Sequence, residues 1–575
     1  MKRVAAIALV FLLFPAGAPA QSTPKAASID DAIAAIAAYG PRALAEQGAP
    51  GMSVAITDRT HTLKILTFGY ANVESKTPVT ETTRFPVGSI SKSMTSLALM
   101  QLHDRGLVDL NAPVQRYLPW WSINSGDGIV VHQLLSHTAG TPDDYTLDGS
   151  YGYQIAALRN AHTIFTPGTK WAYSNDGFAT VGAVAAAVSR RSWQDGIQST
   201  VFAPLGMTHS SAYFDARTMA DTATGYIFRD ADLVATPPHP ALVPAQVVDF
   251  VNPAGSVIST PGDMAAYMRF YLNDGTAGDG ARLLRPSTFT AMTTPDHLTN
   301  GKPAGAASPE LAEWPEFYRR YGYGLAVFDT NGDHLVGHTG GINGYTACMQ
   351  MNLTRGFGVI AMSNLIEAPL HPCAIVKYAM AVLRAQQLGT ALPPAPTALP
   401  IAPPAIVASQ YAGTYRGPAG ATVVVRDNNG TPQLLDGATA YTLDPRGDDL
   451  FWTNDPRFPN YYVAFTRNSS KLVDGFTHGS SLYANERYAG PSSFSYPPGW
   501  NSLTGRYEAN IWGTLMVMRI VVVKNKLTVD GVTPLGPKNG AFMLGASDVR
   551  FDTNAGGKTQ RVWLDGQPLY RIDLP

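Results

Sequence analysis

The sequence predicts an α/β domain followed by an all-β region, and three observations support this division. Segments with a helical apolar period alternate with short strand-like segments up to about residue 388. Downstream of residue 407, short alternating runs separated by turn residues follow, as in small antiparallel barrels. Between the two parts, residues 389–406 hold six prolines and no charged residue, which is typical of an extended linker.

The first twenty residues, MKRVAAIALVFLLFPAGAPA, have the pattern of a secretory signal peptide. Lys2 and Arg3 precede an apolar run, and the segment ends in small residues. We expect residues 1–20 to be cleaved off before Gln21. The apolar run is shorter than the roughly 20 residues that a membrane-spanning helix needs, which argues against an uncleaved anchor. The expected mature protein is secreted, and periplasmic if the host is Gram-negative, with no membrane span.

Composition excludes several classes of protein. Charged residues make up 15% of the chain and the formal net charge is -1, so the basic surplus that nucleic-acid binding requires is missing. The two cysteines, Cys348 and Cys373, are too few for a disulfide scaffold or a cysteine zinc cluster. In an oxidising compartment they could pair, but two buried thiols are equally ordinary, and both possibilities stay open.

The predicted first domain, residues 28–388, has strands at both ends of a long helical middle. This arrangement favours one mixed sheet whose halves come from distant parts of the chain. An amphipathic helix is expected over residues 29–47, and another helix over about 368–387 closes the domain. The predicted strands are 52–57 and 63–71 near the start, and 334–339, 345–352 and 356–364 near the end.

The all-β region contains an internal repeat. YAGTYRG at residues 411–417 is echoed by LTGRYEA at 503–509, and a second echo pairs residues 465–483 with 551–570. We therefore expect two β-barrel modules, residues 407–495 and 496–575. The spacing differs between the two echoes, so the sequence leaves open whether the modules form separate barrels or one continuous barrel.

The stretch FPVGSISKSMTS places Ser89 and Lys92 three positions apart at the start of a predicted helix. Residues at this spacing share a helix face, so the lysine amine can reach the hydroxyl. The helix N-terminus favours developing negative charge. A lysine deprotonated in a closed site could activate the serine as a nucleophile. The alternative is an N-capping serine with an exposed lysine, which is the commoner meaning of Ser-x-x-Lys alone.

Two further stretches carry candidate site residues. In WAYSNDGFATVG, Tyr173 and Asn175 precede an apolar helix; a phenolate could act as a general base and the amide could hold the lysine or the substrate. In GHTGGINGY, residues His338 to Gly340 end a predicted strand, whose backbone could bind an extended substrate and an oxyanion. A hairpin with a surface histidine is the alternative there.

In this order and separation, Ser89-Ile-Ser-Lys92, Tyr173-Ser-Asn175 and His338-Thr-Gly340 resemble the three motifs of the serine β-lactamase and penicillin-binding-protein superfamily. The Tyr-x-Asn form is similar to the class C β-lactamase-like branch, which also contains D-stereospecific peptidases, carboxylesterases and amide hydrolases. Residues 134–143 and 254–268 resemble two further family segments, and the β-modules resemble barrels appended to some D-aminopeptidases. The resemblance spans about residues 30–388.

The resemblance implies a β-lactamase-like domain, with an antiparallel sheet flanked by helices and a helical subdomain. It implies that Ser89 is the nucleophile, that Lys92 and Tyr173 deprotonate it, and that water clears the acyl-enzyme. The residues that would bind substrate or oxyanion are Asn175, His338, Thr339, Gly340 and, after it, Gly341. We expect His137 to be structural, and Asp263 to cap the helix that follows it.

The chain departs from the family pattern at His338, where β-lactamases and transpeptidases carry lysine. A permanent cation for a substrate carboxylate is therefore missing at neutral pH, which weakens the β-lactamase interpretation. Histidine there resembles aminopeptidase and esterase-like members. The sequence thus predicts a secreted serine hydrolase that cleaves a peptide or other amide bond, D-aminopeptidase-like or carboxypeptidase-like.

Two alternatives remain: a carboxylesterase or weak β-lactamase, and, from a different class, a catalytically silent protein that binds peptidoglycan or peptides. The sequence contains no metal-binding or phosphate-binding motif, so we expect no metal and no cofactor. The expected partner is a small-molecule or peptide substrate, and the oligomeric state is not predicted.

Overall fold

The computed structural model describes residues 27–126, 128–142, 151–228, 242–245, 252–305, 318–366, 372–397, 406–511, 514–538, 541–545, 547–554, 556–564 and 567–572. The expected signal peptide lies outside these residues, as does the 398–405 part of the expected linker. Among the helices that are described, none combines the length and the hydropathy needed to cross a membrane.

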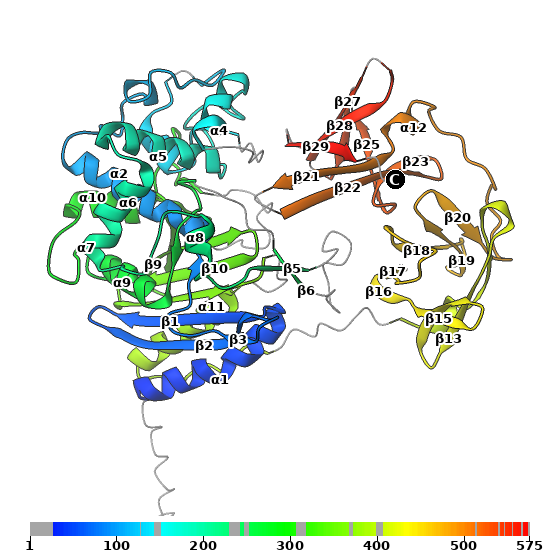
Figure 1. Ribbon diagram of the computed structural model, residues 1–575, viewed down its shortest axis with the longest axis horizontal. Coiled ribbons are helices and arrows are strands. Elements are labelled where there is room, and N and C mark those ends of the chain that lie inside the picture. The colour runs from blue at the N-terminus through cyan, green and yellow to red at the C-terminus, as the bar shows by residue number, and fades with distance from the viewer. Residues whose placement is uncertain are drawn as a thin grey trace, which may run out of the picture.

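A seven-stranded sheet forms the centre of the first part of the chain (Figure 1). Its order is β3-β2-β1-β11-β10-β9-β8. All its pairings are antiparallel, as the family resemblance implies, so the expectation of a mixed sheet from the order of elements is wrong. β1 and β11 pair from Met52↔Ser363 to Asp58↔Phe357, so the two distant halves meet in mid-sheet, as predicted. The strands are β1 (Gly51–Asp58), β2 (Thr62–Asn72), β3 (Thr77–Pro78), β8 (Ala326–Thr330), β9 (Asp333–Ile342), β10 (Tyr345–Asn352) and β11 (Phe357–Ser363).

Two helices, α1 (Ile29–Gln47) and α11 (Cys373–Gln387), pack against one face of this sheet (Figure 1). Their apolar faces form a core with alternate residues of β1, because successive side chains of a strand point to opposite faces. α1 begins at a capping box of Ser28 and Asp31. Cys348 of β10 forms a disulfide with Cys373, with Cα atoms 5.2 Å apart, which joins α11 covalently to the sheet.

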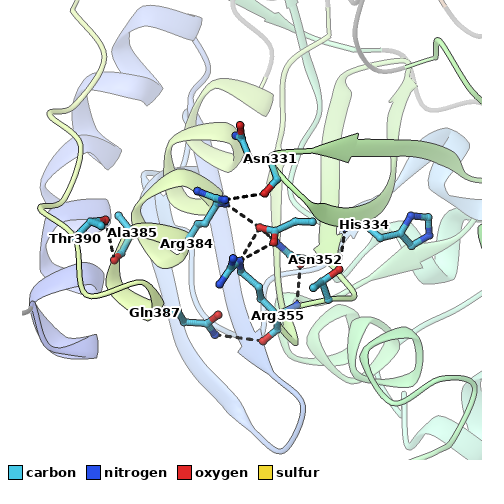
Figure 2. A network of polar contacts seen from close by, with 10 residues as sticks. Asn331, His334, Asn352, Arg355, Arg384, Ala385, Gln387 and Thr390 are labelled. Carbon is cyan, nitrogen blue, oxygen red and sulfur yellow. Dashed lines mark hydrogen bonds and ion pairs between the residues drawn. The ribbon is translucent and has the colours of Figure 1, made fainter.

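Charged side chains add a second link between this helix and the sheet. Asp333, the first residue of β9, is 2% exposed and accepts hydrogen bonds from Arg355 Nε at 2.6 Å and Arg384 Nε at 2.8 Å. Figure 2 shows Arg384 of α11 and Arg355 of the β10–β11 turn converging on this point. Asn352 Nδ2 donates to the same carboxylate at 3.0 Å. The beginning of β9 is therefore held to both neighbouring elements.

The opposite face of the sheet carries the helical part of the domain (Figure 1). α9 (Pro261–Leu272) packs directly on β1 and β11, and α2 (Ser91–Asp104) packs against α5 (Asn175–Ser189). Their buried side chains merge into the largest apolar core of the described chain. The shorter helices are α3 (Val131–Leu135), α4 (Tyr151–Ala157), α6 (Trp193–Ile197), α7 (Ala203–Leu205), α8 (Ala216–Met219) and α10 (Pro286–Thr293).

The all-β region forms two separate nine-stranded sheets of identical topology, each a nearly closed barrel. The orders are β15-β14-β13-β12-β20-β19-β18-β17-β16 and β24-β23-β22-β21-β29-β28-β27-β26-β25. The first sheet contains β12 (Gly413–Arg416), β13 (Thr422–Asn428), β14 (Thr431–Asp436), β15 (Thr439–Thr442), β16 (Asp444–Gly447), β17 (Leu450–Trp452), β18 (Val463–Arg467), β19 (Val473–His478) and β20 (Ser481–Ala484). The second contains β21 (Gly505–Ile511), β22 (Thr514–Val523), β23 (Lys526–Val529), β24 (Thr533–Pro534), β25 (Gly536–Lys538), β26 (Ala541–Leu544), β27 (Ser547–Thr553), β28 (Thr559–Leu564) and β29 (Gln567–Ile572).

The internal repeat seen in the sequence corresponds to equivalent positions in the two barrels. Tyr415 of β12 donates its hydroxyl proton to the carbonyl of Tyr411, and Tyr507 of β21 donates to that of Leu503, both at 2.7 Å. Each tyrosine thus ties its first strand to the residue four positions back. The same tyrosines are fully buried in apolar clusters inside their own sheets. Each one therefore forms part of the packed core of its barrel.

Candidate active site

Ser89 lies in a short 3-10 turn, Gly88–Ile90, immediately before α2. The strand pair β4 (Phe85–Pro86) and β7 (Ile258–Ser259) brings the 254–268 segment beside this turn. Val87 N donates to the Val257 carbonyl at 2.9 Å, and Ser91 Oγ accepts from Val257 N at 3.0 Å. The turn is therefore held from outside as well as by its own helix, and Ser89 stays partly exposed.

Two glycines, Gly88 and Gly340, allow β9 to lie against the serine turn. A Cβ on Gly340 would stand 1.9 Å from the Val87 carbonyl oxygen and 3.2 Å from Ser89 N. A Cβ on Gly88, whose φ is +52°, would stand 2.6 Å from Gly341 N. Neither position tolerates a side chain, whereas Gly341 is open on its free side. The backbone amides of Ser89 and Gly341 therefore both lie where β9 packs against the serine turn.

Lys92 is completely buried and its ammonium contacts three oxygen acceptors. Nζ lies 2.9 Å from Ser89 Oγ, 2.6 Å from Asn175 Oδ1 and 2.9 Å from the Ala254 carbonyl oxygen. A buried cation is tolerated only when such partners replace its water. Three segments therefore meet at Lys92 Nζ: the turn that contains Ser89, the start of α5 and residue 254.

Tyr173 lies two residues before α5, and Asn175 is the first residue of that helix. Ser174, between them, is the N-cap, and its Oγ accepts from Gly177 N at 3.0 Å. This cap aims the Asn175 amide at Lys92. Lys92 Nζ also lies 4.7 Å from the centre of the Tyr173 ring, within range of a favourable cation–π contact.

His338 is buried in β9, which corrects the alternative of a surface histidine, and the strand continues past it to Ile342. Its Nε2 lies 2.9 Å from the Tyr321 hydroxyl and its Nδ1 lies 2.5 Å from the Thr339 carbonyl oxygen. These partners assign the proton to Nδ1, since a carbonyl only accepts. Burial, and then the charge of Lys92, lowers the pKa of His338 to about 3. The imidazole is therefore neutral at pH 7.

Several aromatic residues that were not predicted as site residues contact the site motifs or pack beside them. The Tyr321 hydroxyl contacts His338, and the Tyr318 hydroxyl lies 2.6 Å from Thr339 Oγ1. The Trp171 ring stacks on Tyr318 with centroids 6.2 Å apart. The one available signal was the tyrosine-rich run YRRYGYG. This run is not part of any of the three motifs, and only the fold brings its tyrosines beside His338 and Thr339.

Two expectations for neighbouring residues have different outcomes. His137 is buried and its Nδ1 accepts a hydrogen bond from Ser174 N at 3.0 Å, in agreement with a structural role. Asp263 does not cap α9, because Thr260 is the N-cap. The Asp263 carboxylate instead accepts from His209 N and Ser210 Oγ at 2.8 and 2.7 Å, which joins that loop to the helix.

The site contains one cation and two neutral imidazoles next to a serine, an amide and several phenols. In the part of the chain that the structure describes, no three His, Cys, Asp or Glu side chains are grouped to hold a metal ion. The arrangement can move a proton between Ser89 and Lys92 and can donate backbone N–H groups to an oxyanion.

Curated relatives of this chain include a penicillin-binding protein. Penicillin-binding protein 4 of Amycolatopsis lactamdurans is 28% identical over 291 residues, which cover 49% of this chain and 72% of the relative. Protein flp of Staphylococcus aureus is 23% identical over 326 residues, 55% of this chain and 60% of its own length. The chain thus spans about three fifths of the staphylococcal relative.

Solved structures share the fold. The octameric penicillin-binding protein homologue from Pyrococcus abyssi superposes with a TM-score of 0.53 at 22% identity, covering 87% of this chain and 98% of that one. The D-amino acid amidase from Ochrobactrum anthropi SV3 gives 0.52 at 24% identity, covering 62% and 100%. A family model described as Beta-lactamase matches residues 29–370, well over half of the chain. The protein therefore belongs to the Beta-lactamase family of serine hydrolases.

Proposed function

We propose that the protein hydrolyses a peptide or other amide bond through an acyl-enzyme on Ser89, as D-aminopeptidase-like or carboxypeptidase-like members of the class C branch do. The observation that carries the proposal is the environment of Lys92 Nζ, which contacts Ser89 Oγ, Asn175 Oδ1 and the Ala254 carbonyl at once. A buried lysine placed only for stability would not need a partly exposed serine hydroxyl among its partners.

The same three contacts suit a lysine that gives and takes a proton. As an ammonium, Lys92 donates to all three oxygens. As a neutral amine, it keeps two N–H bonds to Asn175 and Ala254, and its lone pair faces the Ser89 hydroxyl. The proton of Ser89 can then pass to Nζ as Oγ attacks the substrate carbonyl. Tyr173, whose ring lies beside Nζ, takes part in the deprotonation of Ser89 and returns the proton to the leaving group.

The oxyanion of the tetrahedral intermediate would accept hydrogen bonds from the amides of Ser89 and Gly341, which both lie where β9 packs against the serine turn. β8 pairs with β9 only as far as Gly337. Among the described strands, the edge from His338 onward has no partner on that side and could pair with an extended substrate, with Thr339 and Gly340 beside it. Water then attacks the acyl-enzyme, and Ser89 recovers its proton.

His338 bears on the substrate class. Because its imidazole is neutral at pH 7, it offers a carboxylate no charge, unlike the lysine of the usual motif. This favours amides and esters over lactams with an acidic group. Carboxylesterase or weak β-lactamase activity is the near alternative, and a silent binding protein is the alternative from another class.

A substrate panel tests the proposal, with Ser89→Ala as the control. It contains the p-nitroanilides of D- and L-alanine, longer peptides, p-nitrophenyl butyrate and a chromogenic cephalosporin. We expect anilide or peptide hydrolysis that Ser89→Ala abolishes, and slow cephalosporin turnover. Ester cleavage alone would indicate a carboxylesterase. Binding without turnover or a covalent adduct would indicate the silent protein and overturn the proposal.

Secretion is a second proposal, and it rests on the pattern of residues 1–20. Expression of the full chain in a Gram-negative host should yield a periplasmic protein whose N-terminus is Gln21. An intact N-terminus on a protein recovered from the cytoplasm would contradict it.

A further inference from the structure

His137 is a buried titratable residue that the proposed mechanism does not use. Its side chain is 2% exposed and packs among aromatic rings, with the Tyr173 ring centre 4.3 Å away and the rings of Tyr321 and Phe178 at 4.9 and 5.0 Å. It belongs to the 134–143 segment, in the loop after α3. Its contacts are therefore with the Tyr173 turn rather than with solvent.

His137 binds the backbone on both sides of Tyr173. The Ser174 amide donates to His137 Nδ1 and the Ala172 amide donates to the His137 carbonyl, both at 3.0 Å. Four residues later, Thr141 Oγ1 donates to Ser174 Oγ at 3.0 Å. The segment therefore binds the backbone amides of Ala172 and Ser174, the two neighbours of Tyr173 in the chain, and Ser174 is also the residue that caps α5.

The hydrogen bond from Ser174 determines the tautomer of His137. A backbone amide can only donate, so Nδ1 must present its lone pair, and a neutral ring then carries its proton on Nε2. Protonation of Nδ1 would break this bond. The titratable groups that face the ring are Lys92 of α2, His338 of β9, Tyr173 and Tyr321. Among these described groups none is an anion at neutral pH in its usual state, and burial and the charge of Lys92 both oppose a second cation, so the pKa of His137 is lowered well below its ordinary value.

We infer that His137 is a positioning residue, a neutral imidazole that holds Tyr173 and Asn175 in register with Lys92. The inference rests on the proposed function, since it assigns His137 a role in the same site. A displacement of about 1 Å in a group that acts on the reacting atoms can cost on the order of 100-fold in rate. Loss of the acceptor at Nδ1 should therefore lower kcat while leaving substrate binding nearly unchanged.

Two substitutions separate the acceptor from the bulk of the side chain. His137→Asn places its Oδ1 near the position of Nδ1, and asparagine tolerates the φ of +60° found here. His137→Gln carries its amide one bond further, near the position of Nε2, and leaves Ser174 N without its partner. Both variants lose the ring, but glutamine is less suited than asparagine to this φ, so the thermal unfolding of the two variants has to be compared as well.

We expect His137→Gln to lower kcat by about 10-fold to 100-fold with KM changed less than about threefold, and His137→Asn to recover at least about tenfold of that loss. Thermal unfolding of both variants checks that they are folded at the assay temperature. Equal kcat in the two variants, or a Gln variant as fast as wild type, would overturn the inference.

A second measurement does not depend on turnover. In protein labelled with ¹⁵N-histidine, the ring resonances of His137, assigned by their loss in His137→Asn, should show the Nε2–H tautomer from pH 5 to 8, in wild type and in Ser89→Ala. A ring that titrates in this range, or carries its proton on Nδ1, would overturn the inference whatever the kinetics. Absence of Ser89-dependent turnover with an unchanged tautomer would instead count against the proposed function.

Discussion

At the scale of single residues, the site depends on the hydrogen-bond partners of the buried Lys92 amine. Its Nζ has no exposure to solvent and is held by oxygens from three segments. Each of these oxygens stabilises the charged form, but the Asn175 amide is uncharged, so its effect is moderate. A neutral amide therefore allows the lysine to lose its proton, which a carboxylate at the same place would oppose.

Exchange of this amide for a carboxylate tests the general-base role of Lys92. In Asn175→Asp, the added negative charge favours the ammonium, so the acidic limb of the kcat/KM profile should move to higher pH by about one to two units. Asn175→Ala removes the partner without adding charge and should lower kcat without that shift. Profiles of both variants over pH 5 to 10 make the comparison. An unmoved limb in Asn175→Asp would argue against deprotonation of Lys92.

The buried histidines make stability depend on pH. Burial, assisted by Lys92, lowers the pKa of His338 to about 3 and that of His137 well below its ordinary value of 6.5. Between those values the unfolded chain binds protons that the folded chain does not, so stability falls as pH drops below about 6.5. Each histidine contributes up to about 1.4 kcal/mol per pH unit.

We expect His338→Gln to reduce this slope by about one such increment, because glutamine does not titrate. Urea unfolding of the variant and of wild type at intervals between pH 4.5 and 7 gives the two slopes. Equal slopes would mean that folding does not lower the pKa of His338, which would contradict its assignment as a buried neutral imidazole.

At the scale of elements, β9 connects the stable core to the site. It begins at Asp333, which forms ion pairs with Arg355 and Arg384 (Figure 2). Its other end lies beside the serine turn. Burial by itself would raise the pKa of Asp333, but the hydrogen bonds from Arg355, Asn352 and Arg384 outweigh it and lower the pKa. The carboxylate is therefore ionised, and its bonds tie β9 to α11.

Removal of this carboxylate should destabilise the fold. Asp333→Ala leaves two partly buried arginines without their partner, and we expect a loss of about 2 to 4 kcal/mol in the free energy of unfolding at pH 7. Asp329→Ala, in the same β8–β9 hairpin, is a matched control: its side chain is 52% exposed and pairs with Arg320 and His334. That loss should stay below about 1 kcal/mol. Similar losses in denaturant unfolding would contradict the assignment.

At the scale of the whole molecule, the chain divides into parts with their own cores. The apolar clusters of the α/β part draw on described residues up to Leu392, whereas the two barrel clusters draw on residues from Ile406 onward. Each barrel buries its own aromatic side chains, including Tyr415 and Tyr507. The cores therefore provide no apolar link across the linker.

Separate cores predict separate folding. A fragment of residues 21–397 should fold and show a cooperative thermal transition at a temperature within a few degrees of one transition of the full chain. Differential scanning calorimetry of both proteins makes this test, and Ser89-dependent turnover by the fragment is its functional counterpart. An unfolded or aggregated fragment would show that the barrels are needed for the stability of the α/β part.

Local pattern was sufficient for much of the fold. The helix at 29–47 and the strands around 52–57 and 345–352 were predictable because helical and strand periods are properties of contiguous residues. The Ser89, Tyr173 and His338 motifs were recognisable because each occupies a few adjacent positions. The error at Asp263 was also local: Thr260 and Asp263 both suit a helix N-terminus, and only the path of residues 209–210 decides between them.

The sequence by itself determined the family and the order of an α/β part and an all-β part, and it supplied the motif residues, whose roles in the site stay a prediction. Only the tertiary structure decided the pairing of Cys348 with Cys373, the burial and neutrality of His338, and the roles of the Ala254 carbonyl and Tyr321 as partners of Lys92 and His338. The physical reason is that these depend on distance and burial between segments far apart in the chain. No local period encodes such contacts, since the sheet that joins β1 to β11 creates them.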